Sequence, residues 1–153
     1  MNKKLLVLIV SVMVILIAAD IFILLYEKER PESKAPNFDE YIVSDNFTGE
    51  IATIDYSSNG KAKEHKDQIE EEIEKGINFS GRYIVVSWEC GTNCETGVVI
   101  DASDGKIYDL PLDSSCGIDF RVNSKLLVIN SDEDCVRDFA SDSVKTRQFI
   151  WEK

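Results

Sequence analysis

Histidine is nearly absent from this chain of 153 residues, which contains only His65. A Ser-His-Asp triad or a histidine-based metal site would have to depend on that one residue. The G-x-S-x-G, H-E-x-x-H, phosphate-loop and dinucleotide-binding motifs are absent as well. We therefore expect no catalytic residue, no cofactor and no metal ligand, and enzymatic activity is the less favoured interpretation. We expect His65 to be a half-buried, hydrogen-bonded residue of a mostly polar helix.

Basic residues are also scarce. The chain has 17 lysines and arginines against 28 acidic residues, which gives a formal net charge of -11. Nucleic-acid binding requires clustered positive charge, so we expect no nucleic-acid partner. The acidic surface suits a basic protein or a cation instead. Acidic turn residues could bind calcium, but the EF-hand spacing is missing and we expect them to be solvated. They are Asp101, Asp104, Asp109, Asp113 and 132–134.

Apolar residues are concentrated near the start of the chain. The run from Leu5 to Leu25 has 21 residues and one charge, Asp20. About 20 apolar residues in a helix span the hydrocarbon core of a bilayer, which is roughly 30 Å thick. Two interpretations stay open. We favour an uncleaved signal anchor over a signal peptide cleaved after Ala19, because cleavage would expose the apolar residues 21–26. No cysteine directly follows the run, so we do not expect a lipoprotein.

The expected organisation is a short cytoplasmic N-terminus (1–4), a transmembrane anchor (5–25), a linker (26–37) and one domain (38–153). The linker is charged and contains two prolines, which is typical of an extended spacer. The domain is long enough for one hydrophobic core. Beyond residue 26 the chain has 15 basic and 27 acidic residues, a net charge of -12.

The four cysteines, Cys90, Cys94, Cys116 and Cys135, all lie beside turn signals. An even number of cysteines in loops is typical of two disulfides in an oxidising compartment. This places the domain outside the cytoplasm, on a single-pass protein of the cell membrane. Three connectivities are possible, and the sequence alone does not choose between them. We favour Cys90–Cys94 and Cys116–Cys135, because the second pair flanks the open end of one expected hairpin. A four-cysteine zinc site would need closer paired spacing.

The hydrophobic pattern predicts an α+β fold, an antiparallel β-meander of five to six strands with one packed helix. One or two short strands are expected within 38–54. Residues 61–75 predict a helix that ends at Gly76 and has a thin apolar stripe. Such a stripe cannot fold alone, so the helix must pack on the sheet. The stripe consists of Ala62, His65, Ile69 and Ile73.

From Arg82 onward, the hydrophobic pattern repeats every two residues, as in a strand. Residues 82–88 are apolar on both faces, which is typical of a strand covered on both sides. Asp104-Gly105 predicts a tight hairpin. In 118–122 the alternation predicts that Ile118, Phe120 and Val122 point inward. The expected strands are 82–88, 97–101, 106–110, 118–122, 125–130 and 146–152.

Four aromatic residues could line a ligand groove: Trp88, Trp151, Tyr83 and Tyr108. Aromatic residues at alternating strand positions belong more often to a core, and we expect core positions here.

Five segments form a series: NFSGRY (78–83), WECGTNC (88–94), GVVID (97–101), GKIYDLP (105–111) and KLLVIN (125–130). The series resembles an uncharacterised family of small exported or membrane-anchored bacterial proteins with NFxGxY, WxCGTxC and GKxYxLP segments. The resemblance implies an extracytoplasmic domain and supplies no catalytic residue.

Three functions follow as hypotheses. The first is a non-enzymatic binding domain, for example an inhibitor or immunity-type protein for a basic partner. The second is a hydrolase-like enzyme with a site near the Cys90–Cys94 loop. The third is a structural component of the cell envelope.

Overall fold

The computed structural model describes residues 2–28, 35–139 and 144–153. Within the first of these ranges, the side chains of residues 5–8, 10–11 and 23–28 lie outside the description, as do residues 29–34 of the expected linker. The chain divides into two compact units, Met1–Lys34 and Ala35–Lys153.

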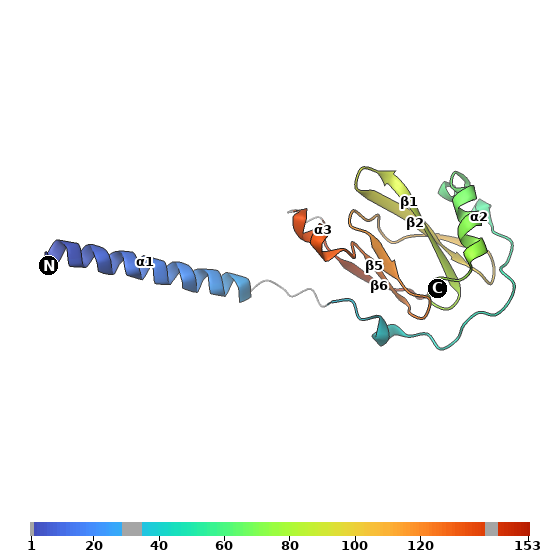
Figure 1. Ribbon diagram of the computed structural model, residues 1–153. Helices are drawn as coiled ribbons and strands as arrows, with labels where there is room; N and C mark the ends of the chain where they lie inside the picture. Colours follow the sequence, from blue (N-terminus) through green and yellow to red (C-terminus); the bar gives the residue numbers. More distant parts are fainter. Residues whose placement is uncertain (1, 29–34, 140–143) are drawn as a thin grey trace. The chain divides into compact units, whose positions relative to one another are not determined.

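The first unit consists of helix α1, Lys3–Lys28 (Figure 1). Its 26 residues include neither glycine nor proline, so no helix-breaking residue interrupts it. Over the described residues, no helix has both the length and the apolar character that crossing a membrane requires. The transmembrane anchor expected at 5–25 therefore remains a prediction.

The second unit is an α+β domain with six strands in its described residues, arranged as two antiparallel three-stranded sheets. The α+β class and the antiparallel pairing are confirmed, but the single meander is wrong. Ser114, in the connection between the sheets, exchanges backbone hydrogen bonds with Glu95. The connection therefore runs back beside the first sheet, and the strand that follows it belongs to a second sheet. The strands are β1 (Tyr83–Gly91), β2 (Cys94–Asp101), β3 (Ile107–Asp109), β4 (Ile118–Phe120), β5 (Leu126–Ile129) and β6 (Arg147–Ile150).

The apolar residues form layers around these sheets. Helix α2 (Lys66–Lys75) packs on one face of the first sheet, and the second sheet packs on the other face (Figure 1). Strand β1 accordingly has both faces buried: Ile84 and Trp88 face α2, while Val85 faces the second sheet. The expected two-sided strand is confirmed. On the outer face of the second sheet, β5 packs against Phe38.

The expected helix over 61–75 is interrupted. A 3-10 helix spans Lys61–Lys63, and α2 begins only at Lys66, because His65 has non-helical backbone angles (φ -114°, ψ 26°). Gly76 ends α2 as expected, since its φ of 93° favours glycine and its N–H donates to the carbonyl of Ile73.

The strands expected within 38–54 are wrong. Phe38–Tyr41 is a 3-10 helix, and the chain then runs past turns of both sheets without forming a strand. Its backbone N–H groups donate one at a time to carbonyls of three turns, two of them in the turn between β2 and β3, so no ladder forms. These bonds are Val43 to Asn123, Phe47 to Gly81, Ala52 to Ala102 and Asp55 to Gly105.

Two further differences concern the second sheet. Strand β4 ends at Phe120, and Val122 is 49% exposed rather than inward. The acidic loop contains a short helix, α3 (Glu133–Asp138), because the Asp132 side chain accepts a hydrogen bond from the N–H of Cys135.

Candidate functional site

Four acidic residues lie along one side of α2: Asp67, Glu70, Glu71 and Glu74. Their spacing is i, i+3, i+4 and i+7, so they share one side of the helix, and all four are exposed. We call them the acidic face. The opposite side of α2 is anchored by Ile69, which is fully buried against the first sheet. The carboxylates therefore project from an element that core packing holds in place.

The charge on α2 is only partly neutralised. The helix has five acidic residues and two lysines. The Nζ of Lys66 lies 3.3 Å from Glu70, and the Nζ of Lys75 lies 3.1 Å from Glu71 and 2.9 Å from Glu72. Hydrogen bonds to Glu72 and Glu71 raise the pKa of Lys75. Asp67 and Glu74 have no ion pair in the described part of the chain.

Two hollows lie along β1, one of about 250 Å³ between α2, β1 and β4, and one of about 630 Å³ beside the turn between β1 and β2. They share Gln68 and Ser87. We call the two hollows together the β1 groove. Its carboxylates come from α2, β1 and β2, and Phe120 of β4 contributes an aromatic wall. The lining residues include Gln68, Glu71, Glu72, Ser87, Glu89, Glu95 and Phe120.

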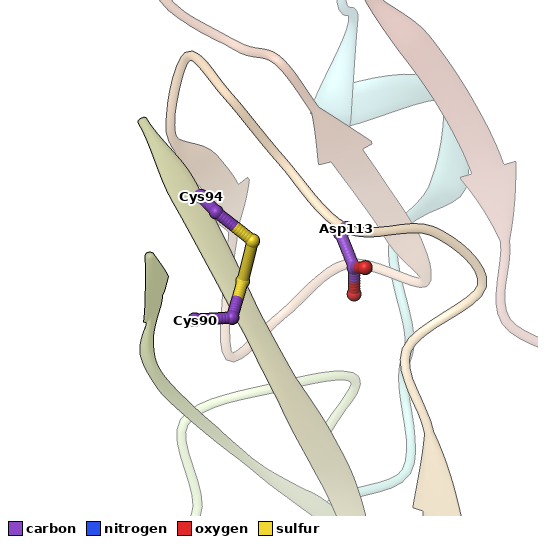
Figure 2. Close-up of side chains that lie close together, drawn as sticks. All are labelled: Cys90, Cys94 and Asp113. Atoms are coloured by element: carbon purple, nitrogen blue, oxygen red, sulfur yellow. A yellow bond between two sulfur atoms is a disulfide. The ribbon is translucent and has the colours of Figure 1, made fainter. Parts of the chain in front are cut away.

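The turn between β1 and β2 is closed by the Cys90–Cys94 disulfide, with the two Cα atoms 5.0 Å apart. Figure 2 shows Asp113, from the connection between the sheets, beside this disulfide. Its carboxylate and both sulfurs lie within 4.8 Å of one another, the one such group of potential metal ligands in the described residues. Neither sulfur can act as a thiolate ligand or nucleophile while the disulfide is intact.

The second disulfide joins Cys116 to Cys135, with the Cα atoms 5.6 Å apart. Both disulfides thus match the pairing that the sequence favoured. Cys116 is buried, and its N–H donates to the Asn130 side-chain oxygen, which also accepts from the N–H of Ser115. This bridge ties α3 to the connection between the sheets.

His65 has the structural role that the sequence predicts. It is half-buried, its Nδ1 lies 2.9 Å from the Gln68 side-chain oxygen, and its ring stacks on Trp88 with centroids 4.0 Å apart. Trp88 is 7% exposed and belongs to the core under α2. Trp151 is buried between the sheets, with its ring edge-to-face against Tyr83 and Tyr108. Trp88, Trp151 and Tyr83 are core residues, as expected, and Tyr108 is half-buried against the same core.

The acidic turn residues are not a single site. Asp101 is buried and forms an ion pair with Arg82, whereas Asp104 pairs with Lys106. Asp109 accepts a hydrogen bond from the Asn59 side chain. The expectation that Asp101 is solvated is wrong, because its carboxylate also accepts from the N–H and hydroxyl of Ser103.

Arg82 also donates to the Tyr83 hydroxyl, which itself donates to the backbone carbonyl of Lys153 at 2.6 Å. Burial raises the pKa of Tyr83 above its ordinary value of 10.0, against the opposing effect of the Arg82 charge. The folded chain therefore retains the Tyr83 proton at a pH where the unfolded chain has lost it.

We expect the free energy of unfolding to fall as the pH rises above about 10 and through the raised pKa of Tyr83. Denaturant unfolding across this range, followed with tyrosinate absorbance, measures both effects. Tyr83→Phe should reduce the alkaline loss. An equal loss of stability in that variant would contradict the assignment of the alkaline effect to Tyr83. It would point to Tyr56 instead, whose pKa is also raised by burial.

Sequence reasoning missed the β1 groove and the Arg82–Asp101 pair. The acidic face could have been found from the spacing of its carboxylates in 61–75. The groove could not, because residues from α2, β1 and β4 meet there only through tertiary packing.

Comparison with protein-family models, with curated proteins and with solved structures finds no match for this chain. The resemblance to the exported bacterial family therefore remains a prediction.

Proposed function

We propose that the chain is a membrane-anchored protein whose extracytoplasmic domain binds a basic protein, as an inhibitor or immunity-type protein would. The observation that carries this proposal is the acidic face of α2. Negative charges on one side of a helix produce a field that attracts a basic partner from a distance and orients it on approach.

The packing of α2 supports this role. Ile69 is fully buried, so the helix cannot turn its carboxylates away without losing this core contact. Lysines pair with only part of the acidic face, which leaves Asp67 and Glu74 available to basic side chains. A site on a rigid element loses less conformational entropy on binding than a site on a loop.

The placement outside the cytoplasm is supported by the two disulfides, which persist in oxidising compartments. The anchor is supported by the apolar run over residues 5–25.

We expect the protein to remain in the membrane fraction with its N-terminus uncleaved. Cell fractionation followed by N-terminal sequencing of the mature chain checks this. A mature chain beginning at Asp20 would contradict the anchor and favour the cleaved signal peptide.

The binding proposal is tested by capture from solubilised membranes, with the full chain as bait. We expect a basic protein to be captured at low salt and released at moderate salt, because exposed charges are screened over about 10 Å at 0.1 M. Neutralising the acidic face with Asp67→Asn, Glu70→Gln and Glu74→Gln should weaken capture by about tenfold, at roughly 0.5 kcal/mol for each exposed charge.

The matched control removes three exposed charges elsewhere: Glu50→Gln, Asp119→Asn and Glu152→Gln. It should weaken capture much less. If both triple variants lose capture equally, only net charge matters and the acidic face is not the binding surface. If no basic protein is captured at low salt, the proposed function is wrong.

A further inference from the structure

Strand β1 is an edge strand, because the order of its sheet is β1-β2-β3. One side of its backbone pairs with β2, and on the other side the part of the chain that the structure describes places no strand. Other residues of the chain form hydrogen bonds with the backbone groups at the start of this open side. Tyr83 exchanges backbone hydrogen bonds with Phe79. The Asn78 side chain accepts from the N–H of Val85 at 2.8 Å and donates to its carbonyl at 3.0 Å.

This capping determines where the next backbone groups point. In an antiparallel pair, alternate residues direct their N–H and C=O groups to the same side of the strand. Since those groups of Val85 point away from β2, the groups of Ser87 and Glu89 do so too. The residues opposite them on β2 support this direction. The carbonyl of Gly97 accepts from the N–H of Leu110, and Glu95 exchanges backbone hydrogen bonds with Ser114, so these groups also point away from β1.

The open groups lie in the β1 groove. By this alternation, the backbone N–H and C=O groups of Ser87 and Glu89 point away from β2, and among the described residues no backbone hydrogen bond outside the strand ladders uses them. These two residues are spaced i and i+2, which is the spacing that strand addition uses. Both line the groove, so its hollows give access to this edge.

The groove walls have negative charge. Glu71 and Glu72 line one hollow, and Lys75 alone offsets them. Glu89 and Glu95 are direct cross-strand neighbours. Like charges at this position destabilise a sheet, and a cation between them would relieve the repulsion. The Ser87 hydroxyl donates a hydrogen bond of 2.7 Å to Glu95, and this bond satisfies only one of the carboxylate oxygens of the two glutamates.

Resting on the proposed function, we infer that the basic partner contributes an extended, lysine- or arginine-bearing segment that pairs with the open edge of β1 at Ser87 and Glu89. Backbone hydrogen bonds supply the docking register. Alternate basic side chains of the segment meet the glutamates of the groove, and Phe120 packs against their aliphatic parts.

The test uses three synthetic peptides with the full chain in neutral detergent. The first alternates lysine and valine, the second is the same peptide methylated at every backbone nitrogen, and the third replaces lysine by glutamate. We expect the first to bind at least tenfold more tightly than the second, because methylation removes hydrogen-bond donors without changing the charge. The third should not bind. Equal affinity for the first two would overturn the inference, because the attraction would then be purely electrostatic.

Hydrogen exchange locates the contact. The first peptide should slow exchange at the amides of Ser87 and Glu89, while the amide of Val86, already directed to β2, should change little. Unchanged exchange at Ser87 and Glu89 would overturn the inference.

A pair of variants separates this inference from the proposed function. Ser87→Pro removes the open N–H at an edge position that tolerates proline, and Ser87→Ala retains it. We expect Ser87→Pro to lose capture of the basic partner by about tenfold, and Ser87→Ala to retain it. Full capture by Ser87→Pro would overturn the inference and leave the proposed function intact. If Ser87→Pro does not fold, the methylated peptide decides.

Discussion

Replacing Trp88 by alanine is expected to destabilise the domain by about 3–5 kcal/mol. Trp88 is buried in the core between α2 and the first sheet, where it contacts a cluster that includes Ile69 and Ile84. It also stacks on His65 at the start of α2. Removing the indole leaves a cavity and detaches the helix start, so the acidic face would lose its support.

Circular dichroism melts of the full chain measure this effect. For a domain of this size, the melting temperature should fall by roughly 10–20 °C. Val122→Ala, at a position that is 49% exposed, is the control and should melt nearly as the natural chain does. An unchanged melt for Trp88→Ala would reject the core assignment and favour a ligand-binding role for this residue.

Removal of the Cys116–Cys135 disulfide has the second largest expected effect. The cross-link spans 19 residues, and the loss of its constraint on the unfolded chain corresponds to about 3 kcal/mol. The shorter Cys90–Cys94 bridge spans 4 residues, and the same reasoning gives about 2 kcal/mol. Total stability of a domain is only about 5–15 kcal/mol, so the first loss is a large share.

We therefore expect Cys116→Ala with Cys135→Ala to melt at a lower temperature than Cys90→Ala with Cys94→Ala. Denaturant unfolding of the two double variants compares them directly. Thiol titration of the native, unreduced chain should find no reactive cysteine, since the structure contains no free cysteine. Four reactive thiols would contradict both the disulfides and the placement outside the cytoplasm.

The local pattern of the chain was enough to predict several elements. The two-sided apolar run at 82–88 predicted a strand buried on both faces, because side chains alternate along a strand whatever it pairs with. Gly76 and Gly105 predicted a helix end and a turn, since both have positive φ values that favour glycine. The position of Cys116 and Cys135 around one hairpin favoured the disulfide pairing that the structure contains, although the sequence left three connectivities open.

The acidic face was contained in the sequence as well. Its four carboxylates recur with the helical period, so their shared side depends only on α2 being a helix. The buried side of α2 follows from the same period, through Ile69.

Other features depend on contacts between distant segments, and only the tertiary structure decided them. The split of six strands into two sheets depends on Ser114 returning to Glu95, a pairing that no local pattern specifies. The stacking of His65 on Trp88 joins residues from two elements. The open edge at Ser87 and Glu89 depends on which neighbour β1 has and on how far the Asn78 side chain reaches. Backbone preference determines that a segment is a strand, whereas the packing of the whole domain determines which edge of that strand remains unpaired.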